Sequence, residues 1–97
     1  MFDIDITISA IEDMRVFRKY EQNRIFDGIE DQLLYHAHIE TRNRKPLRSN
    51  ELAEWELRID PFRVFYSIDH AAQLVSILAV GKKIGNRLFI RGVEYNL

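Results

Sequence analysis

The chain has 97 residues, 46% of them hydrophobic, which is enough for one domain with a single core and too few for two. It contains no cysteine, which excludes a disulfide framework, a thiolate nucleophile and a cysteine-ligated zinc site. The net charge of -1 conceals an asymmetry, because residues 1–41 carry nine acids and four bases whereas residues 42–97 carry six acids and ten bases. This split predicts that one face of the fold meets a polyanion, the alternative being ordinary surface charge.

The N-terminal segment lacks the basic and apolar regions of a secretory leader. No run of residues approaches the roughly 18 apolar residues of a membrane-spanning helix. No internal repeat, linker or low-complexity segment divides the chain. We therefore expect a soluble, cytoplasmic protein with one domain over residues 1–97.

The first two predicted elements are a strand and a helix. Apolar and polar side chains alternate over residues 2–8, which is the period of a half-buried strand. Ser9 lies three residues before Glu12, the spacing of a capping box, so a helix should begin near Ala10. Its apolar stripe consists of Ile11, Met14 and Phe17.

A second, longer helix should follow. Apolar residues recur at helical spacing over residues 25–37. The helix should end near residues 40–42, because the polar run that follows and its Pro46 do not continue a helix. We expect segment 41–50, with the sequence TRNRKPLRSN, to be a loop.

The remaining pattern is typical of strands. The first two form a hairpin that turns at Asp60 and Pro61, and the third is an almost wholly apolar, central strand that should end at Gly81. The predicted strands span residues 54–59, 62–68, 74–80 and, as a candidate final strand, 87–90. This order predicts an α+β domain with two N-terminal helices on one face of a mainly antiparallel sheet.

Three motifs lie in these strands: WELRI at residues 55–59, FRVFY at residues 62–66 and AVGKK at residues 79–83. With the element order, they resemble the RelE branch of the RelE/ParE toxin superfamily of bacterial type II toxin–antitoxin systems. The resemblance covers essentially the whole chain. It implies a small cytoplasmic endoribonuclease that cleaves messenger RNA in the ribosomal A site without a cofactor. It also implies a cognate antitoxin that neutralises the toxin in a hetero-oligomer.

That reaction makes specific demands on side chains. When a ribose 2′-hydroxyl attacks the adjacent phosphate, a base takes its proton, cations offset the charge developing at phosphorus, and an acid protonates the leaving oxygen. The family motif places an arginine at Arg63, and a guanidinium can clamp a phosphate with two hydrogen bonds. Lys83 matches the second family cation, with Lys82 beside it. The alternative for Arg63 is an ion pair with Asp60 or Glu56 across the hairpin.

Three positions depart from the best-known members of the superfamily. Glu54 and Glu56 stand where those members have lysines, so one of these carboxylates is the candidate catalytic base. The alternative is that both are surface residues of the strand. Phe89 lies near the place of a catalytic or base-stacking tyrosine, and it can stack on a base but cannot exchange a proton. Tyr66 and Tyr95 are candidate substitutes.

Segment 41–50 supplies a cluster of cations without interleaved aromatic residues, which favours contact with backbone phosphates over base reading. A solvated loop is the alternative. His36 and His38 lie two apart on a predicted helix and so point in different directions, and we expect no metal site. The candidate RNA-binding residues are Arg42, Arg44, Lys45, Arg48, Arg58, Lys82 and Phe89.

Three functions stay open. The first is a ribosome-dependent endoribonuclease, which Arg63, Lys83 and the basic segment favour. The second is a DNA gyrase inhibitor of the ParE kind, which needs no RNA-cleaving residues. The third is a catalytically degenerate protein that only binds its antitoxin or RNA, which the unusual glutamates and Phe89 suggest. The expected partners are an antitoxin, the ribosome and messenger RNA, with no membrane.

Overall fold

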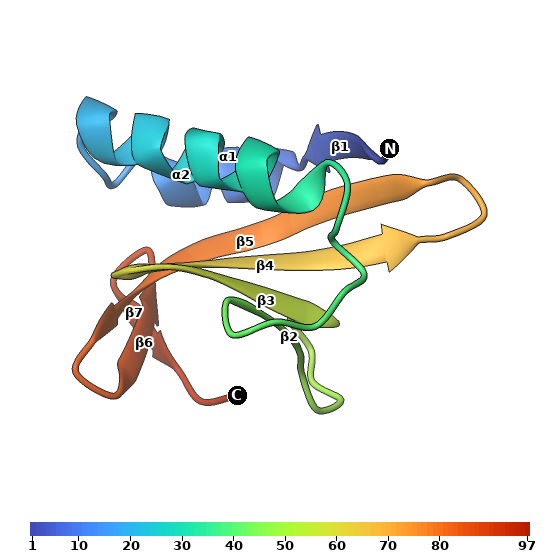
Figure 1. Ribbon diagram of the computed structural model, residues 1–97. Coiled ribbons are helices and arrows are strands. Elements are labelled where there is room, and N and C mark those ends of the chain that lie inside the picture. Colours follow the sequence, from blue (N-terminus) through green and yellow to red (C-terminus); the bar gives the residue numbers. More distant parts are fainter.

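The computed structural model describes residues 1–97, with two helices packed on one face of a seven-stranded sheet (Figure 1). This is the α+β arrangement that the sequence predicts. The elements are β1 (Asp3–Ile6), α1 (Ile8–Met14), α2 (Lys19–Leu33), β2 (Arg44–Pro46), β3 (Trp55–Ile59), β4 (Phe62–Asp69), β5 (Leu74–Ile84), β6 (Arg87–Ile90) and β7 (Val93–Tyr95). Neither helix is long and apolar enough to cross a membrane.

The long strand β5 organises the sheet. The strand order is β2-β3-β4-β5-β6-β7, and all of these neighbours are antiparallel. Strand β4 pairs with β5 along its whole length, whereas β1 pairs in parallel with Leu74 to Ile77 and β6 pairs with Lys82 to Ile84. Since β4 occupies one edge of β5, β1 and β6 share the other edge at different heights.

Helix α1 begins at Ile8, two residues earlier than predicted. The cap is Thr7, whose hydroxyl accepts a hydrogen bond from the Ala10 amide at 3.2 Å and donates one to the Ile77 carbonyl at 2.8 Å. The prediction of a Ser9 cap is therefore wrong, and Ser9 lies within the helix. Thr7 caps the helix in place of Ser9 because its hydroxyl also binds strand β5. Capping-box spacing in the sequence does not reveal this tertiary contact.

Helix α2 ends at Leu33, earlier than the predicted residues 40–42. The Leu34 carbonyl accepts a hydrogen bond from the Phe2 amide at 2.7 Å, so the N-terminal strand takes an acceptor that the next helical turn would use. Farther along, the Ala37 carbonyl accepts the Tyr66 hydroxyl at 2.8 Å. Both bonds tie the chain after α2 to the sheet.

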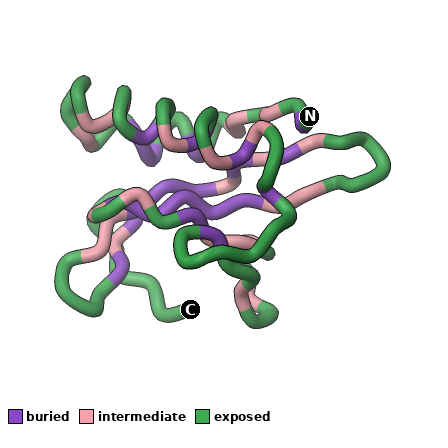
Figure 2. Tube along the Cα trace, viewed as in Figure 1, coloured by how far each residue is buried: buried purple, intermediate pink, exposed green.

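Two apolar clusters lie on opposite faces of the sheet. The larger one fills the layer between the helices and the central strands, where the buried segments of the tube in Figure 2 run. It includes Met14, Ile25, Leu57, Val64 and Ile77. A smaller cluster on the other face consists of Phe65, Ala79, Leu88 and Ile90. This second cluster supports the C-terminal hairpin β6–β7.

Three details of the strand prediction differ from the structure. Gly81 does not end the central strand, because β5 continues to Ile84. A Cβ atom at Gly81 would lie 2.7 Å from the Phe89 carbonyl oxygen, so glycine here permits the close approach of β6. Segment 41–50 is not wholly a loop, since Arg44–Pro46 pairs with β3 as β2. Strand β7 was not predicted.

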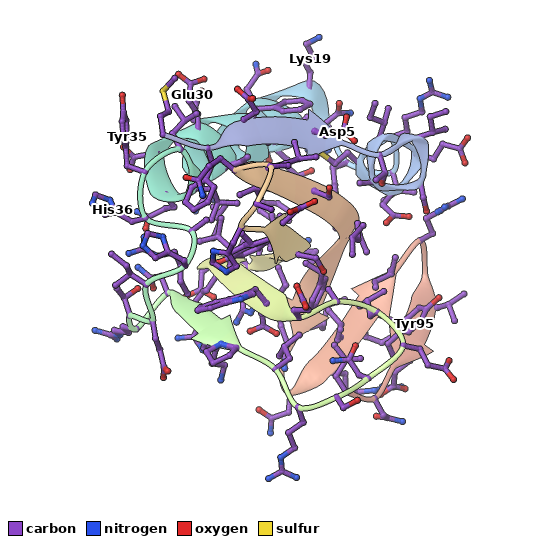
Figure 3. The ribbon with its side chains drawn as sticks, turned by 90° about the vertical axis from the view of Figure 1, so that its right-hand side faces the viewer. Asp5, Lys19, Glu30, Tyr35, His36 and Tyr95 are labelled. Carbon is purple, nitrogen blue, oxygen red and sulfur yellow. The ribbon has the colours of Figure 1, made fainter.

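The buried hydroxyl of Tyr66 generates a stability prediction. Tyr66→Phe leaves the Ala37 carbonyl without its partner, and the free energy of unfolding in urea should fall by about 1–3 kcal/mol. Tyr35→Phe is the matched control, because Tyr35 is 60% exposed and points outward (Figure 3), and it should change nothing. An unchanged Tyr66→Phe variant would contradict the assigned bond.

Burial raises the pKa of the Tyr66 hydroxyl above its ordinary range. The unfolded chain therefore loses this proton at a lower pH than the folded chain. The stabilisation is complete below the unfolded pKa of about 10 and is lost as the pH rises further. The stability difference between wild type and Tyr66→Phe should accordingly narrow above that pH.

Candidate functional site

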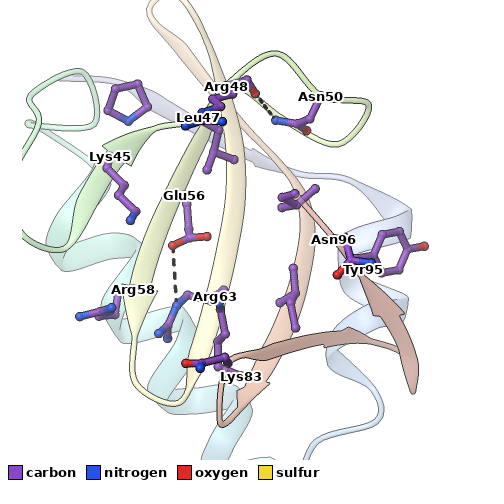
Figure 4. Close-up of a pocket in the computed structure, with 14 residues that line it drawn as sticks. Lys45, Leu47, Arg48, Asn50, Glu56, Arg58, Arg63, Lys83, Tyr95 and Asn96 are labelled. Atoms are coloured by element: carbon purple, nitrogen blue, oxygen red, sulfur yellow. Dashed lines mark hydrogen bonds and ion pairs between the residues drawn. The ribbon is translucent and has the colours of Figure 1, made fainter.

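The face of the sheet that the helices leave uncovered carries charged side chains from four neighbouring strands, β2 to β5. Successive residues of a strand point to opposite faces. Leu57 and Val64 belong to the core beneath the helices, so the alternate residues of β3 and β4 face the other way. These residues line a cavity of about 470 Å³ (Figure 4). Its charged lining consists of Lys45, Arg48, Glu56, Arg58, Arg63 and Lys83.

Arg63 lies at the base of this cavity and is only 5% exposed. Its Nη1 donates hydrogen bonds to Asp60 Oδ1 and to the Phe62 carbonyl, both at 2.9 Å. Its Nε is 3.7 Å from Glu56 Oε1 and is the only buried side-chain nitrogen or oxygen in the protein without a hydrogen-bond partner. Arg63 thus forms ion pairs with both carboxylates that the alternative interpretation names. It also lines the cavity, and its Nε has no hydrogen-bond acceptor.

The structure separates the two candidate carboxylates. Glu56 faces Arg63 inside the cavity, where its side chain is 13% exposed (Figure 4). Glu54 lies outside this cavity, and its Oε1 accepts a hydrogen bond from the Ile68 amide at 3.3 Å. Of these two carboxylates, only Glu56 therefore lies beside Arg63.

The two lysines of β5 lie on opposite faces of the sheet. Lys83 lines the cavity, whereas Lys82 does not, because neighbouring residues of a strand point to opposite faces. Phe89 pairs with Lys82 and also lies outside the cavity, with its ring centroid 5.2 Å from the guanidinium carbon of Arg87. The structure therefore brings one of the two lysines to Arg63 and leaves out the predicted stacking phenylalanine.

The cations of segment 41–50 also differ in whether they line the cavity. Lys45 and Arg48 line the cavity and are exposed, whereas Arg42 is exposed but does not line it. Arg44 is buried, and its Nε donates to the Ile39 carbonyl at 3.0 Å while its Nη1 donates to Gln32. Arg44 thus anchors β2 to the end of α2 instead of facing solvent.

The remaining polar lining was mostly not foreseen. Tyr95 lines the cavity from β7, and its ring points away from Arg63 and Lys83 in Figure 4. Tyr66, the other candidate tyrosine, is wholly buried in the core beneath the helices. The asparagines of the lining gave no signal in the sequence, because they come from separate loops. They are Asn50, Asn86 and Asn96.

Charge is the main property of this site. Five cationic side chains and one carboxylate line the cavity, so its potential favours an anion. Charge-assisted hydrogen bonds from guanidinium and ammonium groups suit phosphate oxygens. No group of three or more histidine, aspartate or glutamate side chains is arranged to hold a metal ion.

A matched pair of lysine variants tests whether the cavity binds phosphate. Inorganic pyrophosphate should raise the thermal midpoint of the wild type and of Lys82→Ala, whereas Lys83→Ala should bind about tenfold more weakly because it loses one charged contact. Both substitutions remove one positive charge from the same strand. Equal weakening in the two variants would show that only net charge matters.

The family model described as "ParE toxin of type II toxin-antitoxin system, parDE" matches residues 4–83. This range begins in β1 and ends at Lys83, so it includes the helices and the central strands. No curated protein matches the chain.

Several solved toxin–antitoxin complexes contain a chain of similar fold. The RelBE2 complex from Mycobacterium tuberculosis has a TM-score of 0.61 and 24% identity, covering 84% of this chain and 91% of that chain. The archaeal RelE-RelB complex from Pyrococcus horikoshii has a TM-score of 0.64 and 15% identity, covering 81% and 91%. The E. coli RelBE complex has a TM-score of 0.59 and 15% identity, covering 88% and 100%.

These structural likenesses show a common fold, and the family match extends over most of the chain. Both agree with the resemblance carried by the WELRI, FRVFY and AVGKK motifs. The chain therefore belongs to the ParE toxin family of type II toxin–antitoxin systems, within the RelE/ParE superfamily that its motifs indicate.

Proposed function

We propose that this toxin is a ribosome-dependent endoribonuclease that cleaves messenger RNA in the A site and so inhibits translation. The observation that carries the proposal is the placement of a carboxylate, Glu56, 3.7 Å from the guanidinium of Arg63 in a cavity lined with cations. A base beside a phosphate-binding cation is the arrangement that attack by a 2′-hydroxyl requires.

In the proposed reaction Glu56 accepts the proton of the 2′-hydroxyl. The 2′-oxygen forms a bond to phosphorus, the bond from phosphorus to the 5′-oxygen breaks, and that oxygen takes a proton from water. The products are a 2′,3′-cyclic phosphate and a 5′-hydroxyl. Arg63 offsets the charge on the non-bridging oxygens, and Lys83 is the cation that we assign to the leaving oxygen.

The ion pairs of Arg63 leave one of its donors without a hydrogen bond. Asp60 is 69% exposed on its side chain, so water screens its attraction to Arg63. The Nε of Arg63 makes no hydrogen bond at all. Because this nitrogen is buried and lies 3.7 Å from Glu56 Oε1, a phosphate oxygen can accept its hydrogen bond once the side chains around it move aside.

The outer cations suit a longer RNA. Arg58, Lys45 and Arg48 lie on the rim or walls of the same cavity, from β3, β2 and the segment after it. Their spacing around Arg63 favours contact with phosphates next to the scissile one. Arg42, exposed beyond the cavity, is then a candidate for contact with ribosomal RNA.

A cognate antitoxin is the expected protein partner, since the similar folds come from toxin–antitoxin complexes. We propose that it forms a hetero-oligomer with the toxin in the cytoplasm. Acidic residues of an antitoxin segment that lies over the cavity would pair with its cations and exclude RNA.

The second candidate function is inhibition of DNA gyrase. The description of the matching family as ParE favours it, and such an inhibitor needs neither Glu56 nor Arg63. A catalytically inactive protein that only binds antitoxin or RNA is a third outcome. The experiments below separate all three.

Arg63→Ala is the first test. The toxin is induced in cells, and messenger RNA ends are mapped on translated and untranslated transcripts. The wild type should give codon-phased cuts on translated messages alone, and Arg63→Ala should lower cleavage at least about 100-fold because it loses the main phosphate contact. Arg15→Ala, an exposed arginine outside the cavity, should cleave normally.

Other outcomes would point elsewhere. Cleaved DNA with intact RNA would support the gyrase function, and no effect of the wild type on either would support the inactive protein. A fully active Arg63→Ala variant that retains its fold by circular dichroism would remove the central residue of the proposal.

The two carboxylates provide the second test. Glu56→Gln keeps the shape of the side chain but removes the base, so cleavage should fall about 100-fold or more. Glu54→Gln is the matched control because it makes the same chemical change outside the cavity, and it should retain cleavage. Rates are compared on ribosomes programmed with a short message. Full cleavage by both variants would rule out Glu54 and Glu56 as the base.

A further inference from the structure

The hairpin β6–β7 forms one wall of the cavity but has little support from the sheet. Leu88 and Tyr95 line the cavity from its two strands, and Asn96 follows directly. The hairpin joins the sheet through only three residue pairs, between β6 and the end of β5. The position of this wall therefore depends on contacts other than strand pairing.

Besides the apolar cluster around Leu88 and Ile90, a buried carboxylate supplies such a contact. Asp13, near the end of α1, is 2% exposed. Its Oδ2 accepts a hydrogen bond from the Val80 amide at 3.1 Å, in the stretch of β5 that lies between its pairings with β1 and β6. Its Oδ1 accepts a hydrogen bond from Arg91 Nε at 2.6 Å. Asp13 thus joins helix, sheet and hairpin.

Arg91 completes this connection from the hairpin turn. Its Nη1 lies 3.3 Å from Glu12 Oε2, and its Nη2 donates to Ser9 Oγ at 3.3 Å, so one guanidinium contacts three side chains of α1. The hydrogen bond to Asp13 is also the main reason that the pKa of Arg91 is raised. Asp13, Arg91 and Tyr95 also line a second cavity, of about 310 Å³, which is separate from the cavity that contains Arg63.

The backbone of Arg91 is unfavourable for an arginine. Arg91 and Gly92 form the two-residue turn between paired Ile90 and Val93, and their φ angles are +49° and +76°. Positive φ at both positions is the pattern of a type I′ turn, in which Asn-Gly is the favoured pair. An arginine in the left-handed region is disfavoured relative to asparagine or glycine. The side-chain contacts with α1 offset this cost.

We propose that Arg91 is a positioning residue that clamps hairpin β6–β7 to helix α1 through Asp13 and thereby holds the wall of the RNA cavity in place. The part that concerns RNA rests on the proposed function. The clamp itself is a property of the fold. Neither Asp13 nor Arg91 is assigned a chemical step, because they lie outside the cavity that contains Arg63.

The decisive variant is Arg91→Asn. Asparagine suits the type I′ turn, so the substitution removes the clamp without disfavouring the hairpin. Amide hydrogen exchange of residues 87–95 should become about tenfold faster. Arg91→Lys keeps a cation near Asp13 and should restore part of the protection. The matched control is Arg87→Gln, which removes the Arg87–Glu94 pair within the same hairpin and leaves the link to α1 intact.

The kinetic readout separates positioning from chemistry. On ribosomes programmed with message, Arg91→Asn should raise KM about tenfold and change kcat less than about twofold, because the wall binds substrate while Glu56 and Arg63 act on it. Arg87→Gln should change neither parameter.

Each alternative result has a definite meaning. Unchanged hydrogen exchange in Arg91→Asn would overturn the clamp, and faster exchange with an unchanged KM would overturn its role in holding the wall. If the wild type does not cleave RNA, the proposed function fails, and the hydrogen-exchange comparison alone decides whether Arg91 clamps the hairpin.

Discussion

The pairing of strand β5 is the constraint on which the rest of the structure depends. Buried backbone amides and carbonyls need partners, and β5 finds them in β4 on one edge and in β1 and β6 on the other. This register places Gly81 opposite Arg63 and leaves room for β6 to cross closely. Because its side chains alternate, the same strand presents Val80 to the core and Lys83 to the cavity.

The cavity keeps a buried charge that is only partly offset. Removing a guanidinium from water is costly unless carboxylates and hydrogen bonds compensate it. Arg63 receives this compensation from Asp60 at the rim and from the nearby carboxylate of Glu56, yet its Nε lacks a partner. In the proposed function, such a site is arranged for a phosphate before the RNA binds, as electrostatic catalysis requires.

Much of the site can be predicted from the sequence, because the two-residue period of a strand determines which face of the sheet each side chain lies on. Glu56, Arg58 and Arg63 share one face of a predicted hairpin, and the structure brings them together. The sequence places Lys82 beside Lys83 as a candidate RNA-binding residue, but β5 continues past its predicted end at Gly81, so the two side chains lie on opposite faces of the sheet.

Other differences arise from contacts between distant segments. Arg44 looks like a loop cation, but its guanidinium reaches the end of α2. The link between Asp13 and Arg91 joins residues 78 positions apart and has no local signature. The sequence by itself determined the α+β class, the family and the alternating charges of the hairpin, because these depend on local periodicity and short motifs. Only the tertiary structure decided which charges are buried, paired or open to a ligand, because that depends on which distant backbone and side-chain groups satisfy one another.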